Sequence, residues 1–146
     1  MGYTIESWTP DKGFLSGIYV KANKDPDLLL ISPTGKRIAI ECKFRSDFYR
    51  SGDRESITWS QMRRAYDYMK YGDEKGVTVF LALGVGGSAK SPKHVYLVPI
   101  STLMKKQFSS ERLIKNKKHF ATTKSKLDRW LVNVTSGQGI NERLGV

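Results

Sequence analysis

The sequence predicts an α/β fold, a mixed β-sheet flanked by helices. Two short apolar runs, at residues 28–31 and 38–40, are joined by a turn-forming segment, which is typical of a β-hairpin. An amphipathic helical segment follows at about 59–71, and two further apolar runs follow at 77–83 and 94–100. A helix between the second hairpin strand and the next strand is a crossover connection, so those two strands are expected to be parallel.

The turn of the hairpin fixes which residues face each other. Pro33 suits the first central position of a type I turn, because its φ is already near −65°. Gly35 suits the left-handed residue that closes a three-residue loop. With this loop, counting back along both strands places Asp27 opposite Glu41. A loop of two or four residues would instead move Asp27 to the other face.

The two faces of the hairpin differ in chemistry. Side chains alternate across a strand, so Asp27, Glu41 and Lys43 share one face. The opposite face is expected to be apolar and to carry Leu28, Leu30, Ile38, Ile40 and Cys42. Two carboxylates that lie directly opposite each other repel, so this arrangement predicts a neutralising cation beside them.

A divalent cation would satisfy the carboxylates of Asp27 and Glu41. Mg²⁺ takes oxygen ligands from one or two carboxylates together with substrate phosphate, which points to phosphoryl chemistry. The bound metal would polarise a phosphoryl oxygen and lower the pKa of a bound water. Lys43 would orient or deprotonate that water, or stabilise charge in the transition state. The alternative is a structural salt bridge between Lys43 and one of the acids.

These residues resemble the signature of the PD-(D/E)XK nuclease superfamily. A Pro-Asp pair ends at Asp27, and a Glu-Cys-Lys triplet runs from Glu41 to Lys43 after the hairpin turn. The resemblance covers roughly residues 14–100 and implies a restriction-endonuclease-like mixed β-sheet core flanked by helices. It also implies that Asp27 and Glu41 bind Mg²⁺, with Mn²⁺ as a substitute, and that Lys43 is the catalytic lysine. The size and element order are similar to those of Holliday-junction resolvases.

Two further residues enter through the same resemblance. Superfamily members often begin with a helix that carries an extra acid near the metal, and Glu6 is the only acid among the first ten residues. The helix after the Glu-x-Lys strand often carries a Gln close to the site, and Gln61 matches this location. The alternatives are a solvent-exposed Glu6 and a Gln61 that only caps the helix.

The helix after the hairpin is expected to start with a capping box. Thr58 and Gln61 occupy the N-cap and N3 positions of this motif. Apolar residues at helical spacing predict the side that faces the core, formed by Met62, Ala65, Tyr66 and Met69. Gly72 and Gly76 are expected to end the helix.

The basic residues predict a nucleic-acid partner, chiefly DNA. The chain has 25 Lys and Arg against 14 Asp and Glu, a net charge of +11. The segment from about residue 101 holds 10 of the basic and 3 of the acidic residues, and so carries +7. Phosphate contacts are expected from that segment, and from a polar loop at 46–56 with its flank: Arg45, Arg50, Arg54, Lys115, Lys117 and Lys118. The alternative is a solvated basic surface.

Length and composition predict one domain spanning residues 1–146. The hydrophobic fraction of 39% is ordinary for a globular protein, and no apolar run reaches the roughly 18 residues of a membrane span. No signal-peptide pattern opens the chain, which favours a cytoplasmic location. One Cys and two His argue against an internal disulfide and a zinc site. A strand is also expected at 14–20, and short helices at about 102–107 and 110–117.

The sequence therefore predicts a Mg²⁺-dependent endodeoxyribonuclease, acting alone, as a homodimer or within a larger nuclease complex. One alternative is a nucleic-acid-binding module that keeps the nuclease fold without the activity. The intact Asp27, Glu41 and Lys43 argue against it, since a binding module does not need an acidic pair facing a polyanion. A metal-independent RNA endonuclease would favour a Tyr–His–Lys site, but His94 and His119 lie outside the hairpin. Restriction, repair and junction-resolving roles are not separated at this level.

Overall fold

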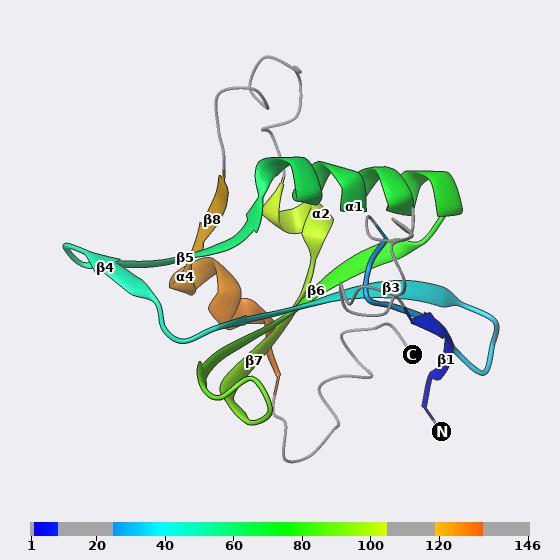
Figure 1. The fold of residues 1–146 in the computed structure, drawn as a ribbon, viewed down its shortest axis with the longest axis horizontal. Helices are drawn as coiled ribbons and strands as arrows, with labels where there is room; N and C mark the ends of the chain where they lie inside the picture. The colour runs from blue at the N-terminus through cyan, green and yellow to red at the C-terminus, as the bar shows by residue number, and fades with distance from the viewer. Residues whose placement is uncertain (1, 9–24, 105–118, 133–146) are drawn as a thin grey trace, which may run out of the picture.

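The structure, a computed structural model, describes residues 2–8, 25–104 and 119–132 of the chain. At its centre is a six-stranded mixed sheet with the strand order β1-β2-β3-β6-β7-β9, and helix α1 (Met62–Lys75) packs on one face (Figure 1). The strands of this sheet are β1 (Thr4–Trp8), β2 (Leu28–Ile31), β3 (Arg37–Arg45), β6 (Thr78–Gly87), β7 (Pro92–Pro99) and β9 (Leu131–Val132).

Strands β2 and β3 form the expected hairpin in the expected register. Leu28 pairs with Ile40 in an antiparallel ladder. Gly35 in the turn has a φ of 86°, the left-handed conformation that the three-residue loop requires. The ladder ends at this pair, and Asp27 and Glu41 are the next residues beyond it.

Helix α1 connects β3 to β6, and these two strands are parallel as predicted. Its C-terminal end also matches the expectation, because Gly76 caps the helix with a φ of 64°. Gly72 lies inside the helix rather than at its end. A Cβ at Gly72 would lie 2.9 Å from the carbonyl oxygen of Val77, so glycine is needed where the chain returns towards β6.

A second, three-stranded sheet has the strand order β4-β5-β8. Its strands are β4 (Tyr49–Ser51), β5 (Arg54–Gln61) and β8 (His119–Thr123). The prediction of a loop at residues 46–56 is therefore wrong. Instead β4 and β5 form a hairpin that turns at Gly52, with a φ of 61°, and projects from the body of the molecule (Figure 1).

The start of α1 and its buried side also differ from the prediction. β5 continues through the expected capping box, and the helix begins only at Met62. Pairing with β8 and the complete burial of Trp59 draw this segment into a sheet and override its local helix signal. Tyr68 is fully buried whereas Tyr66 is 44% exposed, so the prediction that Tyr66 faces the core is wrong.

Arg45, at the end of β3, joins the two sheets. Its guanidinium donates hydrogen bonds to the backbone carbonyl oxygens of Phe44 at 2.7 Å, Thr58 at 2.8 Å and Trp59 at 3.3 Å. Phe44 belongs to β3, whereas Thr58 and Trp59 belong to β5. This side chain therefore fixes β5 against the hairpin, at a position where the sequence predicted a phosphate contact.

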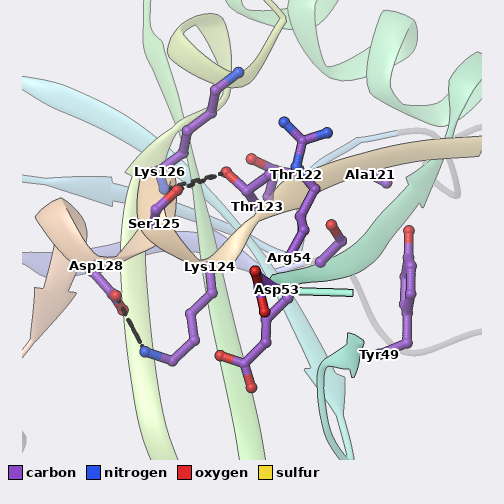
Figure 2. Close-up of a pocket in the computed structure, with 12 residues that line it drawn as sticks. Tyr49, Asp53, Arg54, Ala121, Thr122, Thr123, Lys124, Ser125, Lys126 and Asp128 are labelled. Atoms are coloured by element: carbon purple, nitrogen blue, oxygen red, sulfur yellow. Dashed lines mark hydrogen bonds and ion pairs between the residues drawn. The ribbon is translucent and has the colours of Figure 1, made fainter. Parts of the chain in front are cut away.

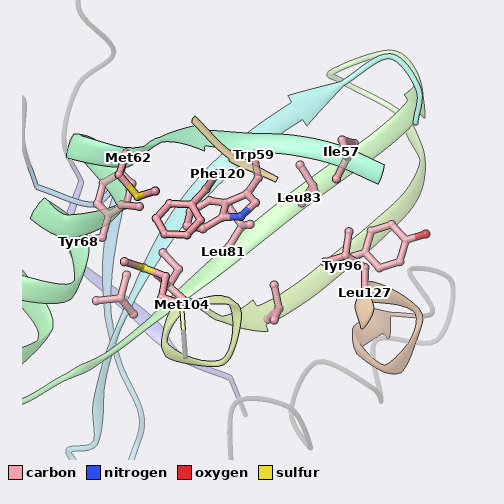
Figure 3. Close-up of a cluster of buried hydrophobic side chains, with 14 of the residues drawn as sticks. Ile57, Trp59, Met62, Tyr68, Leu81, Leu83, Tyr96, Met104, Phe120 and Leu127 are labelled. Carbon is pink, nitrogen blue, oxygen red and sulfur yellow. The ribbon is translucent and has the colours of Figure 1, made fainter. Parts of the chain in front are cut away.

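The main hydrophobic core lies between α1, the large sheet and the second sheet (Figure 3). Trp59 of β5 stacks on Phe120 of β8, with ring centroids 5.7 Å apart. A smaller cluster covers the opposite face of the large sheet and contains Ile38, Ile40, Phe80, Leu97 and Val132. Leu28 and Leu30 pack against this cluster, which confirms the apolar face of the hairpin, although Cys42 is exposed.

The remaining described elements are short. Helix α2 (Ile100–Leu103) follows β7, and α4 (Lys124–Leu127) and η2 (Asp128–Trp130) lead into β9. Strands β6 and β7 confirm the runs predicted at 77–83 and 94–100. Within the ranges that the structure describes, no helix has the length and apolar composition needed to cross a membrane.

Other expectations fall on residues that the structure does not describe. They are the strand at 14–20, the helix at 110–117 and the second half of the helix at 102–107. The same holds for three residues with predicted phosphate contacts, Lys115, Lys117 and Lys118.

Candidate active site

Asp27 and Glu41 face each other at the end of the β2–β3 hairpin away from its turn. Asp27 immediately precedes β2, and its Oδ2 accepts a hydrogen bond from the backbone N–H of Cys42 at 2.7 Å. This bond fixes the Asp27 carboxylate beside the strand that carries Glu41. Glu41 is 3% exposed and Asp27 is partly exposed. One acid is therefore covered by protein while the other reaches solvent.

The buried carboxylate of Glu41 is held through one oxygen. Its Oε1 accepts a hydrogen bond from the Tyr68 hydroxyl at 2.7 Å and lies 2.8 Å from Lys43 Nζ. These two donors offset the cost of removing the carboxylate from water. Within the described residues, the hydrogen bond and ion pair of Glu41 both use Oε1, and the hydrogen bond of Asp27 uses Oδ2. Glu41 Oε2 and Asp27 Oδ1 take no part in these contacts.

Tyr68 projects from α1 towards the sheet and has no exposed surface. Burial and the Glu41 carboxylate raise the pKa of its hydroxyl well above the usual range. The hydroxyl therefore stays protonated and remains a hydrogen-bond donor to Glu41. Two cations lie near the Tyr68 ring, with Lys43 Nζ 6.0 Å and Arg64 Cζ 5.7 Å from the ring centroid.

Cys42 separates Glu41 from Lys43, and its side chain lies on the other face of β3. Partial desolvation and the charges of Asp27 and Glu41 raise the pKa of Cys42 to about 11, although the side chain is exposed. The thiol is therefore protonated near neutral pH, and its side chain lies on the other face of the strand from the acid pair. The ligands that the acid pair offers are oxygens.

This donor set fits a hard divalent cation. Mg²⁺ is typically held by one or two carboxylates and keeps several waters, which leaves room for a substrate phosphate. Asp27 and Glu41 offer one unused oxygen each, which meets this requirement. Within the described ranges, no group of three or more His, Cys, Asp or Glu side chains is arranged to hold a metal.

Glu6 does not join the acid pair. It lies in β1, which pairs with β2, and its Oε1 is 2.6 Å from Arg37 Nη2. Arg37 precedes Glu41 by four residues on β3, which is about 13 Å along an extended strand. Glu6 thus forms an exposed ion pair nearer the hairpin turn, in a different place from the one that the resemblance implies.

Gln61 lies at the border of the site. It is the N-cap residue of α1, is exposed, and makes no side-chain capping hydrogen bond. It precedes Tyr68 by about 10 Å along the helix axis. The structure therefore brings Asp27, Glu41 and Lys43 together, and Gln61 is not among the hydrogen-bond partners of Glu41.

Tyr68 and Arg64 are the residues of this site that the sequence did not predict. They lie four residues apart on α1 and therefore on the same side of the helix. Helical spacing alone allows either position 66 or position 68 to continue the buried stripe. In the structure position 68 is the buried one, and its hydroxyl donates to Glu41 on the facing strand.

Two of the predicted basic residues, Arg50 and Arg54, belong to the second sheet and not to the hairpin that carries the acid pair. Arg50 and Arg54 are exposed on the β4–β5 hairpin. This hairpin, β8 and α4 surround a hollow of about 760 Å³ whose lining carries both signs of charge (Figure 2). Lys124 in this hollow is paired with Asp128 at 3.1 Å. None of the lining residues belongs to β2, β3 or α1, so the hollow is separate from the candidate active site.

Among solved structures, this chain is similar to Hjc, a Holliday junction resolvase from the archaeal hyperthermophile Archaeoglobus fulgidus. The match has a TM-score of 0.55 and 15% sequence identity, and covers 88% of this chain and 80% of that chain. The fold is restriction-endonuclease-like. This confirms the predicted fold class, and at such low identity the likeness shows the fold alone. No family model and no curated protein matches the sequence.

The Tyr68→Phe variant tests the contact between α1 and Glu41. It removes the hydroxyl and keeps the ring, and a hydrogen bond to a charged group stabilises a protein by about 1.5–3 kcal/mol. The free energy of unfolding, measured in urea, should fall by that amount. Tyr49→Phe is the control, because Tyr49 is 52% exposed on β4 and should change the free energy by less than about 0.5 kcal/mol. Equal effects of the two variants would contradict the role of this hydrogen bond.

Proposed function

We propose that this chain is a divalent-metal-dependent endonuclease that hydrolyses phosphodiester bonds in DNA. The observation that carries the proposal is the arrangement of Asp27, Glu41 and Lys43 on one face of the central hairpin of a restriction-endonuclease-like fold. A structural neighbour named as a Holliday junction resolvase supports the nuclease class. Its named substrate makes branched DNA one candidate, alongside the substrates of restriction and repair enzymes.

Asp27 and Glu41 would hold Mg²⁺, with Mn²⁺ as a substitute. A bound divalent cation supplies Lewis-acid polarisation of a phosphoryl oxygen and lowers the pKa of a bound water. The protein residues do the positioning. The Cys42 N–H orients Asp27, and the Tyr68 hydroxyl orients Glu41. Both acids are thus set in place before a substrate arrives, which reduces the reorganisation needed for catalysis.

Lys43 would act on the substrate side of the acid pair. Its side chain is 25% exposed, whereas that of its partner Glu41 is 5% exposed. The ammonium is therefore held at a fixed place by a buried acid while it remains reachable from solvent. In that place it would orient the attacking water or stabilise negative charge that develops on the phosphate.

The charge of the chain supports a polyanionic substrate. The net charge is +11, and Arg50 and Arg54 are exposed on the projecting β4–β5 hairpin. These residues are candidates for sequence-independent phosphate contacts. Lys115, Lys117 and Lys118 remain candidates from the sequence, and Glu6 and Gln61 are not part of the proposed machinery.

A nucleic-acid-binding module without activity is the second candidate function. The observation that favours it is the Glu41–Lys43 ion pair. Such a pair can stabilise the fold, so it gives both residues a structural role that requires no catalysis. The two functions differ in what happens to bound DNA. Incubation with linear, supercoiled and branched DNA, with and without Mg²⁺ or Mn²⁺, therefore separates them.

The Asp27→Asn variant tests the role of the acid pair. It keeps an oxygen that accepts the Cys42 N–H and removes the negative charge. Cleavage with Mg²⁺ should fall at least about 100-fold, since a metal ion contributes several kcal/mol of transition-state stabilisation. The free energy of unfolding should not fall, because repulsion with Glu41 is relieved. Asp53→Asn, on the exposed turn of the β4–β5 hairpin, should cleave like the parent. Parent-like cleavage by Asp27→Asn, or cleavage that a chelator does not affect, would contradict the proposal.

The Lys43→Met variant separates a catalytic lysine from a structural one. Methionine keeps an unbranched apolar stem beside the Tyr68 ring but removes the ammonium. Single-turnover cleavage at saturating enzyme should slow by ~10²–10⁴-fold, the range of a positioned acid–base group. DNA affinity should change little, because the Lys43 ammonium is already paired with the Glu41 carboxylate at 2.8 Å. A variant that cleaves bound DNA at the parent rate would remove Lys43 from the catalytic residues.

A further inference from the structure

We propose that Arg64, beside the Glu41–Lys43 ion pair, forms a phosphate-binding site for the DNA strand that lies at the acid pair. The inference rests on the proposed function and adds a substrate-contacting residue on α1. The ligand is a phosphodiester group of DNA. Arg64 would hold this group beside Asp27 and Glu41, so that the bond to be cleaved is fixed relative to them.

Arg64 lies on α1 close to the side chain that contacts the buried acid. It lies in the first turn of α1, and its Cζ is 5.7 Å from the centroid of the Tyr68 ring. Lys43 Nζ is 6.0 Å from the same centroid. The hydroxyl of this ring donates to Glu41, so both cations are placed around the side chain that touches the buried acid. Arg64 is partly exposed whereas Tyr68 is fully buried, so the guanidinium lies at the solvent edge of the site.

The guanidinium of Arg64 is not paired with a carboxylate among the described residues. Among the described residues, the ion pairs of the protein involve Arg37, Lys43, Lys70 and Lys124, and Arg64 makes none. Its contact with the Tyr68 ring is a cation–π contact and not a hydrogen bond to an acceptor oxygen. A guanidinium carries several N–H donors along its planar edge. This edge matches the geometry of a phosphate group, which a guanidinium binds through two parallel hydrogen bonds.

Arg64 balances the charge of the side chains around the acid pair. Asp27 and Glu41 carry two negative charges that would repel a DNA strand, and Lys43 supplies one positive charge against them. Arg64 supplies a second, so the four side chains together are neutral before any cation binds. A phosphate can therefore approach the acid pair without a net repulsion from these residues.

Arg63 provides a matched control. It is the neighbouring residue on α1, carries the same charge and is exposed. Successive residues of a helix are rotated by about 100°, so Arg63 projects in a different direction from Arg64. Any effect that depends only on net charge or helix propensity should be the same for both positions.

The test measures DNA binding by the full chain with a short fluorescent duplex in chelator-treated buffer, so that cleavage does not contribute. The slope of log K against log salt concentration becomes shallower by roughly 0.9 for each phosphate that the protein no longer neutralises. Arg64→Gln should reduce the slope by about 0.9 and weaken binding about tenfold. Arg63→Gln should leave the slope and affinity close to those of the parent. Arg64→Met, which keeps aliphatic cover over the Tyr68 ring, should reduce the slope by the same amount as Arg64→Gln.

A slope that is unchanged in both Arg64 variants, or no lower than in Arg63→Gln, would overturn the proposal and leave Arg64 as a support of the Tyr68 ring. The outcome is separable from that of the proposed function. If Arg64 is needed for binding but no divalent cation induces cleavage, the phosphate-binding site stands and the hydrolysis fails. If the parent cleaves DNA and the Arg63 and Arg64 variants bind alike, the hydrolysis stands and the phosphate-binding site fails.

Discussion

The buried carboxylate of Glu41 is the constraint on which the rest of this site depends. An ionised carboxylate with 3% exposure is costly unless it is paired and hydrogen-bonded. Both partners of Glu41 act on Oε1, the Tyr68 hydroxyl from α1 and the Lys43 ammonium from β3. The same contacts therefore attach the crossover helix to the sheet, fix Lys43, and leave Oε2 unused. The contacts of Glu41 with Tyr68 and Lys43 therefore stabilise the fold and also position the residues of the proposed active site.

The second acid is placed by the backbone rather than by side-chain packing. The turn around Gly35 sets the register of β2 and β3, which brings Asp27 opposite Glu41. The backbone N–H of Cys42 then holds Asp27 Oδ2. Because Glu41 lies in β3 and Asp27 directly precedes its partner strand β2, the paired strands hold the two acids near each other. Such rigid support is what a site needs if its groups are to hold a metal and a phosphate together.

The hairpin could be predicted from the sequence because its determinants are local. Pro33 and Gly35 specify the turn, and alternation assigns the faces, so Asp27, Glu41 and Lys43 follow from a few adjacent residues. The second sheet could not be predicted in this way. Trp59 enters β5 by stacking on Phe120, and this partner is about sixty residues away in the sequence. The burial of Trp59 in the second sheet stabilises the strand more than the local capping motif would stabilise a helix start at this position.

The positions of the residues outside the hairpin, Glu6 on β1 and Tyr68 on α1, also could not be predicted from the sequence. The resemblance suggested Glu6 as an extra acid, but the pairing of β1 with β2 places it against Arg37. Tyr66 and Tyr68 are both compatible with a helical stripe, and in the structure Tyr68 is the one that packs in the core and contacts the acid on the facing strand. Both placements depend on contacts between elements that are distant in the chain. A local sequence pattern does not contain information about such contacts.

The central claim is that Asp27 and Glu41 bind one divalent cation through the oxygens that the protein leaves unused. The most direct measurement is an anomalous difference map from a crystal of the full chain grown with Mn²⁺. The account predicts a peak at coordination distance from both carboxylates, with Glu41 contributing Oε2 while Oε1 keeps its bonds to Tyr68 and Lys43. A Mn²⁺ ion bound elsewhere, or no peak beside this pair at saturating Mn²⁺, would contradict it.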